Sequence, residues 1–149
     1  MKKSLFSTLL MMVLSVVAFA KNDKEDDKEK GKKATVSYHA HDLVGAKDVI
    51  WSKTGKFQKA SFIKDGARMT AFYNWQNELI ATTQIVDVTE LPAKAIGNLV
   101  KYFPDNKMGE IVRYKNDETV YFVNLTNEKE DFIVKVDGSN NVSYFKRLK

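Results

Sequence analysis

The chain has 149 residues, a formal net charge of +5 and no cysteine. This length allows one domain, or two small repeats that share a core. The missing cysteines exclude thiol catalysis, disulfide exchange and cysteine-ligated metal sites. The basic excess does not indicate a nucleic-acid-binding protein, because residues 34–149 carry 16 basic and 14 acidic side chains and are nearly neutral. We therefore expect no nucleic-acid partner.

The first 20 residues have the pattern of an export signal. Lys2 and Lys3 precede a mostly apolar stretch that runs from Leu5 to Val17, and Ala18-Phe19-Ala20 matches the small-x-small pattern of signal peptidase sites. A transmembrane anchor needs about 20 consecutive apolar residues, and this stretch is shorter. We predict a signal peptide over residues 1–20, cleavage after Ala20, a periplasmic or secreted protein, and no membrane attachment after cleavage.

Residues 21–33 read KNDKEDDKEKGKK and contain no apolar side chain. A segment of this composition cannot bury enough surface to offset the entropy lost on ordering. We interpret it as a charged, disordered spacer. Its six lysines and five acidic residues leave a net charge of +1, which argues against an electrostatic tether to a surface. The folding domain is then predicted at residues 34–149.

Most of this domain alternates apolar and polar side chains with the two-residue period of β-strands. Turn sequences such as Lys64-Asp65-Gly66 and Asp137-Gly138-Ser139-Asn140 separate the alternating segments. Because the connections are short, we expect antiparallel meanders. The predicted strands lie near residues 48–54, 57–63, 68–74, 78–86, 109–115, 119–126, 131–137 and 141–147.

One segment has the helical period instead. Apolar side chains recur at intervals of three and four residues between 91 and 103, which predicts an amphipathic helix. Thr89 is a candidate N-cap, and Pro92 is tolerated in a first helical turn. Pro104-Asp105-Asn106 is expected to end the helix.

The two halves of the domain match in pattern at an offset of 63 residues, which relates Trp51 to Tyr114. This offset predicts an α+β fold of two tandem repeats, about residues 34–87 and 88–149. Each repeat would be a helix packed on an antiparallel sheet of about four strands, and the alternative that the two sheets join as one long curved sheet stays open. The first helix is the weaker one, and its apolar side would consist of Val36, Ala40 and Leu43.

Five short blocks of the sequence carry a resemblance to a known family. They are Val49-x-Trp51, Lys59-Ala60-x-Phe62, Ala71-Phe72-Tyr73-Asn74, Glu78-Leu79-Ile80-Ala81-Thr82-Thr83 and Leu91-Pro92. With these blocks, residues 34–149 resemble the PepSY-like, or β-lactamase-inhibitor-like, exported proteins of Bacteroidetes-type bacteria. The resemblance implies tandem helix-and-sheet units and a role in binding or inhibition. The chain departs from the family pattern in a first helix short of aromatic residues and in the turn Trp75-Gln76-Asn77, which lacks the glycine often found there.

No arrangement of catalytic or metal-binding residues stands out. His39 and His41 would share a face on a strand but diverge on a helix, and Asp42 is the one further ligand type beside them. The sequence contains no G-x-S-x-G motif and no glycine-rich phosphate loop. Carboxylates such as those of Asp117 and Glu118 fall at predicted hairpin ends, where exposed charge is normal. We therefore expect no enzymatic activity, no cofactor and no metal.

The sheet face that a helix leaves uncovered is the predicted binding surface. The alternation places aromatic and cationic side chains there, a mixture typical of protein interfaces. An equally weighted interpretation is that these rings pack between the repeats or under a loop, and that cation–aromatic pairs merely stabilise the sheet. The predicted protein-binding residues are Arg68, Phe72, Trp75, Arg113, Phe122, Lys135, Phe145 and Arg147.

Together these patterns predict an exported binding module, with the form of a peptidase or hydrolase inhibitor, that presents its open sheet face to an envelope or extracellular protein. The alternative is a carrier or sensor that holds a small ligand or a peptide between the two repeats. The sequence makes no prediction of the oligomeric state.

Overall fold

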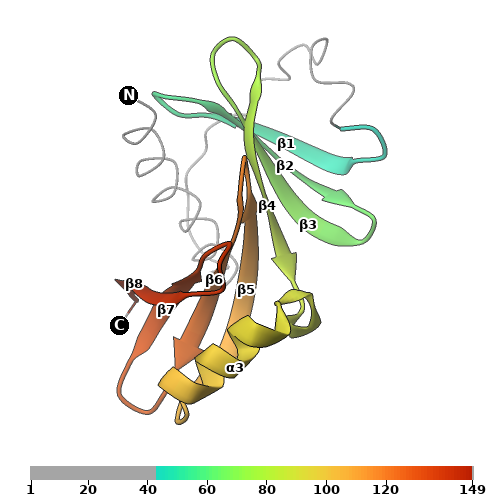
Figure 1. Cartoon of the computed structure of the whole chain (residues 1–149). Coiled ribbons are helices and arrows are strands. Elements are labelled where there is room, and N and C mark those ends of the chain that lie inside the picture. The colour runs from blue at the N-terminus through green and yellow to red at the C-terminus, as the bar shows by residue number, and fades with distance from the viewer. Residues whose placement is uncertain (1–42, 149) are drawn as a thin grey trace. The chain divides into compact units, whose positions relative to one another are not determined.

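The computed structural model describes residues 43–148 of the chain. In this range eight strands form one antiparallel sheet in sequence order (Figure 1). The strands are β1 (Lys47–Lys53), β2 (Gln58–Lys64), β3 (Ala67–Tyr73), β4 (Leu79–Val86), β5 (Lys107–Lys115), β6 (Thr119–Thr126), β7 (Asp131–Val136) and β8 (Val142–Arg147). A short 3-10 helix η1 (Val88–Glu90) and the helix α3 (Ala93–Tyr102) connect β4 to β5. These bounds confirm the eight predicted strands and the helix predicted between residues 91 and 103.

The turns form for local reasons that the sequence indicates. Asp65 and Gly66 have φ angles of 52° and 77°, as a two-residue turn that matches the twist of the strands requires. In a longer turn, Asn127 Oδ1 accepts hydrogen bonds from two backbone N–H groups at 2.8 and 3.0 Å. Asn77 has a φ of 65°. Asparagine tolerates this left-handed conformation, and it therefore replaces the glycine expected in the turn that holds Trp75.

The start of α3 differs from the prediction in one detail. Pro92 occupies the N-cap position and makes no side-chain cap hydrogen bond. The predicted cap, Thr89, lies within η1 instead, where its backbone N–H donates to Asp87 Oδ1 at 3.0 Å. At the other end, the N–H of Phe103 donates to the carbonyl oxygen of Leu99 at 2.9 Å. α3 therefore begins directly after the proline that the sequence places in its first turn.

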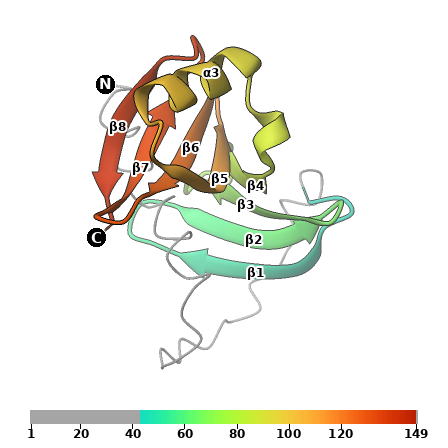
Figure 2. The same ribbon diagram turned by 90° about the horizontal axis from the view of Figure 1, so that it is seen from below.

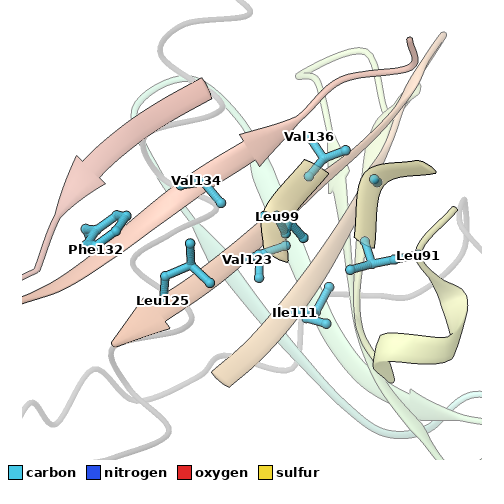
Figure 3. Packing of buried hydrophobic residues seen from close by; sticks show 9 residues of the cluster. Leu91, Leu99, Ile111, Val123, Leu125, Phe132, Val134 and Val136 are labelled. Carbon is cyan, nitrogen blue, oxygen red and sulfur yellow. The ribbon is translucent and has the colours of Figure 1, made fainter. Parts of the chain in front are cut away.

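The larger core lies between α3 and the C-terminal strands. Ala95 and Leu99 are one helical turn apart and are 0% and 1% exposed, because both face the sheet. Figure 3 shows Leu99 among side chains from β5, β6 and β7. The buried members of this core are Leu91, Ala95, Leu99, Ile111, Val123, Leu125, Phe132, Val134 and Val136.

A smaller core lies on the same sheet face in β1–β3. Ala60 pairs with Trp51 on one side and with Ala71 on the other, so these three side chains share a face. Figures 1 and 2 show α3 on the C-terminal part of the sheet, away from β1 and β2. The buried residues of this core are Ala60, Phe62, Ala71 and Tyr73, and the residues packed against them are Leu43, Ala46, Trp51 and Met69.

The sheet corrects the predicted fold class. The predicted tandem repeats, each a helix on about four strands, are wrong: β4 and β5 pair at five positions, from Thr82↔Lys115 to Val86↔Ile111, and join all eight strands. Within residues 43–148, α3 is the single α-helix. Alternation predicts strands without saying which strands pair, and two unpaired edges in the middle of the domain would be unfavourable.

The offset of 63 residues also fails in detail. Trp51 pairs with Ala60, so the offset would pair Tyr114 with Val123. Instead Tyr114 pairs with Val120, and the pairing of β5 with β6 shifts between Met108 and Ile111. A bulge of the same kind lies in β1 between Lys47 and Ile50, so the bulge does not distinguish the two halves. The different pairing of Trp51 and Tyr114 shows that the register of the first hairpin does not recur at this offset.

Several predictions concern residues outside the described range. They are the signal peptide with its cleavage site, the charged spacer, the weaker first helix and the His39–His41 pair. Within residues 43–148, none of the helices has the length and hydropathy that crossing a bilayer requires. In the same range no three or more His, Asp or Glu side chains are grouped to hold a metal ion.

Candidate functional site

The sheet face opposite α3 carries a set of aromatic and aliphatic side chains, which we name the aromatic face. Strand pairing defines it: Phe72 lies beside Ala81, and Phe122 lies beside Val112. In the part of the chain that the structure describes, no helix packs on this face. The aromatic face consists of Phe57, Phe72, Ala81, Ile85, Val112, Tyr114, Val120, Phe122, Ile133 and Phe145.

Two ring pairs organise this face. Phe57 and Phe72 meet edge to face with ring centroids 5.6 Å apart, and Phe122 and Phe145 do so at 5.0 Å. Phe72 is 0% exposed and Phe122 is 1% exposed. These two predicted surface residues therefore lie on the predicted face as buried rings, and Phe145 is half-buried beside Phe122.

Cations lie between the rings. Lys59 is the strand neighbour of Phe72, and Lys135 is the strand neighbour of Phe122. Burial lowers the pKa of Lys59, because a poorly solvated site disfavours the charged ammonium. Arg68 lies on the same face and is exposed. The sequence prediction omitted Lys59, although its alternation with Ala60 contained the signal.

Arg113 is a correction to the predicted surface. It pairs with Gln84 on the side of the sheet that α3 occupies. Its Nη1 lies 2.9 Å from Glu90 Oε2, and its Nη2 donates to Gln84 Oε1. Arg113 therefore connects β5 to η1 and is not part of the aromatic face.

Arg147 is the second correction. It pairs with Phe132, which belongs to the core under α3, and its Nε lies 3.8 Å from Glu130 Oε2. Tyr114 lies on the aromatic face, where burial raises the pKa of its hydroxyl to about 12.

Arg113 was predicted for the other face because Ile111 and Val112 are both buried, on opposite faces of β5, so alternation alone does not decide between the faces. Arg147 changes face because the pairing of β7 with β8 shifts between Ile133 and Val134.

Trp75 lies where the sequence places it, in the turn between β3 and β4. The ring is 49% exposed. Asn74 Oδ1 accepts hydrogen bonds from the N–H groups of Gln76 and Glu78 at 3.0 and 2.8 Å, which fixes the turn around it. Trp75 is therefore a large exposed ring on a structured turn.

A groove that no sequence pattern predicts lies where β4 and β5 diverge. Val86↔Ile111 is the last pair of the ladder, after which β4 leads into η1 while β5 extends away. The groove has a volume of about 470 Å³. Its lining residues are Ile85, Val86, Asp87, Val88, Asn106, Met108, Gly109, Glu110 and Ile111.

Glu110 is the unusual residue of this groove. Burial raises the pKa of its carboxyl group, and the positive charge of Arg68 partly opposes that shift. Glu110 Oε1 is buried without a hydrogen-bond partner, and so is Nδ2 of Asn106, which also lines the groove. By contrast, the hydrogen bond from Thr89 lowers the pKa of Asp87.

Comparison with protein-family models gives no match for this chain, and comparison with curated protein sequences gives none either. Solved structures do match. A DUF2874 family protein from Bacteroides uniformis has a TM-score of 0.70 and 10% identity, over 77% of this chain and 90% of that chain. A BLIP-like protein from Bacteroides fragilis has a TM-score of 0.68 and 12% identity, over 82% of this chain and 92% of that chain.

The chain has a BLIP-like fold. A Bacteroides eggerthii protein provisionally assigned to the periplasm shares the fold, with a TM-score of 0.70 and 12% identity over 78% of this chain and 91% of that chain. The BLIP-like fold agrees with the β-lactamase-inhibitor-like part of the sequence resemblance, whereas no family model supports the PepSY-like part. At such identities the shared property is the fold, and function must be argued from the residues of this chain.

Proposed function

We propose that this protein is an exported, non-enzymatic binding module that docks a protein partner on the aromatic face of its sheet. The pairing of cations with rings carries the proposal: Lys59 lies beside Phe72, and Lys135 lies beside Phe122. Aromatic residues are enriched in protein interfaces, and a partly desolvated cation such as Lys59 is stabilised by a partner of opposite charge. No helix of residues 43–148 covers this side.

The rim of the aromatic face offers anchors for a partner. Ile63 is 38% exposed, and Trp75, in the turn after β3, is 49% exposed. Arg68 lies next to Ile63 across the β2–β3 ladder and is also exposed. Tryptophan and arginine are frequent hot spots of binding energy. In this proposal the buried rings fix the sheet, and the exposed rim makes the contacts.

The proposed location is the periplasm or the exterior of the cell. The pattern of Met1 to Ala20 supports export, and the provisional periplasmic assignment of one structural neighbour agrees with it. The resemblance to β-lactamase-inhibitor-like proteins, together with the BLIP-like fold, supports inhibition of a peptidase or hydrolase as the form that binding takes.

Site-specific photo-crosslinking tests the docking face. A photoreactive residue at position 63 lies on the rim of the aromatic face, and the same residue at position 100 lies on α3. Ile63 and Val100 are both exposed aliphatic residues, 38% and 55%, so the two variants are matched. We expect a protein adduct of defined mass from position 63 and none from position 100. Adducts from position 100 alone, or equally from both positions, would overturn the proposal.

Carriage of a peptide or small ligand between the two halves is the second candidate function. The five pairs between β4 and β5 close most of that junction, which argues against a large cavity there. The groove at the end of this ladder, of about 470 Å³, is the feature that favours the second candidate. Its volume suits a side chain or a small ligand.

A further inference from the structure

The groove between β4 and η1 on one side and β5 on the other combines negative charge with apolar walls. Asp87 and Glu110 are its acidic lining residues, and the described residues that line it include no Lys or Arg. Its apolar walls consist of Ile85, Val86, Val88, Met108 and Ile111. A ligand that is cationic at one end and aliphatic along its length would match both properties.

Two polar atoms of the groove lack partners. Glu110 Oε1 and Asn106 Nδ2 are buried and make no hydrogen bond. A buried polar atom without a partner is unfavourable, so a ligand that bonds to it recovers free energy on binding. One atom is an acceptor with negative charge and the other is a neutral donor. The complementary ligand therefore offers a cationic donor and a carbonyl acceptor.

Burial makes the charged form of Glu110 unfavourable for the fold, and Arg68 offsets only part of this cost. The pKa of Glu110 is raised by burial, and Arg68 attracts it from a distance without a described ion pair between the two. Asp87 is different, because Oδ1 of its carboxylate is held by the Thr89 N–H at 3.0 Å. A carboxylate that lies in a groove and has a perturbed pKa is a candidate ligand-binding group, because such shifts lower the stability of the fold and cluster at functional sites.

We propose that this groove binds the side chain of a lysine or arginine residue in a peptide segment. The cationic group would donate to Glu110 Oε1, and the methylene stem would lie on the apolar wall that includes Val86 and Met108. The backbone carbonyl of the bound residue would accept from Asn106 Nδ2. This groove borders the aromatic face, because Ile85 belongs to both. The two proposals name different occupants and are tested by different experiments, so a failure of either leaves the other standing.

Titration with two matched peptides tests the site. The probes are acetyl-Ala-Ala-Lys-Ala-Ala-amide and the same peptide with norleucine, which keeps the aliphatic stem and removes the charge. We expect the lysine peptide to bind the purified protein about tenfold more tightly, as a charge-assisted hydrogen bond to a buried carboxylate implies. Equal affinity for the two peptides, or no measurable binding of either, would overturn the proposal.

The variant Glu110→Gln assigns the effect to the groove. We expect it to lower the affinity for the lysine peptide about tenfold and to leave the norleucine peptide unchanged. Glu118→Gln, at an exposed position in the β5–β6 turn, is the matched control and should change neither affinity. An unchanged lysine-peptide affinity in Glu110→Gln would contradict the assignment. If Glu110→Gln fails to fold, the difference in affinity between the lysine and norleucine peptides on the unaltered protein still tests the proposal.

Two further variants separate the contacts. Asn106→Ala should weaken the lysine peptide about threefold but leave n-butylamine unaffected, because the amine alone has no carbonyl for Asn106 Nδ2. Arg68→Gln should tighten lysine-peptide binding by a few-fold, because it removes a positive charge that competes for Glu110. Loss of n-butylamine binding in Asn106→Ala, or weaker lysine-peptide binding in Arg68→Gln, would contradict this geometry.

Discussion

The two ends of the sheet share one strand pattern, but their cores are covered differently. At the C-terminal end nine buried residues, among them Leu99, lie between α3 and the strands. At the N-terminal end four buried residues form the core, and no described helix lies over them. The same strand pattern therefore occurs at both ends, whereas the element that covers the sheet face determines how much apolar area is buried there.

The largest expected effect comes from breaking the covered core. Leu99→Ala removes a side chain that is 1% exposed at the centre of the contact between α3 and the sheet. We expect a loss of about 2–5 kcal/mol in the free energy of unfolding, as for other buried leucines. Urea unfolding followed by circular dichroism measures it.

The neighbouring residue of α3 provides the control for that experiment. Val100 is 55% exposed, so Val100→Ala should change the free energy of unfolding by no more than about 0.5 kcal/mol. If Leu99→Ala and Val100→Ala lower the free energy of unfolding by the same amount, Leu99 is not a buried contact between α3 and the sheet.

A matched pair of substitutions compares the two cores directly. Phe132 and Phe62 are 4% and 5% exposed, so Phe→Leu removes similar buried area from each. The ring of Phe132 lies 5.6 Å from that of Phe103 and 5.8 Å from that of Tyr144, whereas no ring pair of Phe62 is found within residues 43–148. We expect Phe132→Leu to cost about 1 kcal/mol more than Phe62→Leu. An equal or reversed cost in chemical unfolding would show that the two cores do not differ in this way.

A smaller effect is expected at the connection between the two ends. Glu90 of η1 pairs with Arg113 of β5, and their side chains are 51% and 30% exposed. Glu90→Gln should therefore lower the free energy of unfolding by about 0.5 kcal/mol or less at low ionic strength. In about 1 M salt the difference from the unaltered protein should disappear, because the ions screen an exposed pair. A difference that persists in salt would show that the pair is not a screened surface interaction.

The last prediction concerns pH and the sign of one pKa shift. Burial raises the pKa of Glu110 in the folded state, so the protonated carboxyl favours folding and the carboxylate opposes it. Glu110→Gln should raise the melting temperature at neutral pH. That gain should shrink as the pH falls through the raised pKa, and it should vanish below the ordinary glutamate value of about 4.3. Thermal melts over this range, with Glu118→Gln as the control, measure it; a gain that grows on acidification would contradict the assigned shift.

Much of the secondary structure could be predicted because it depends on local pattern. The strand bounds follow from alternation and from turns such as Asp65-Gly66, whose positive φ angles suit those residues. The pairing of β4 with β5 could not be predicted in this way. It brings together segments separated by α3, and no periodicity encodes which strands become neighbours.

The candidate site was harder to predict than the strands. Phe72 and Phe122 fall on the predicted face, but their burial depends on neighbours such as Phe57 and Phe145, which strand pairing alone brings close. Arg113 was assigned to the wrong face because Ile111 and Val112 are both buried, on opposite faces of β5, and the pattern fits either orientation. The groove around Glu110 forms where the pairing of β4 with β5 ends. No motif in the sequence predicts the position of that end.

The central claim is that a partner docks on the aromatic face, and lysine acetylation rates test it most directly. Lys135 lies on that face beside Phe122, and Lys101 lies in the last turn of α3 on the opposite side. Mass spectrometry can follow both lysines in the free protein and in the complex with the partner identified by crosslinking. We predict that the partner slows acetylation of Lys135 and leaves that of Lys101 unchanged. Protection of Lys101 with no change at Lys135 would contradict the account.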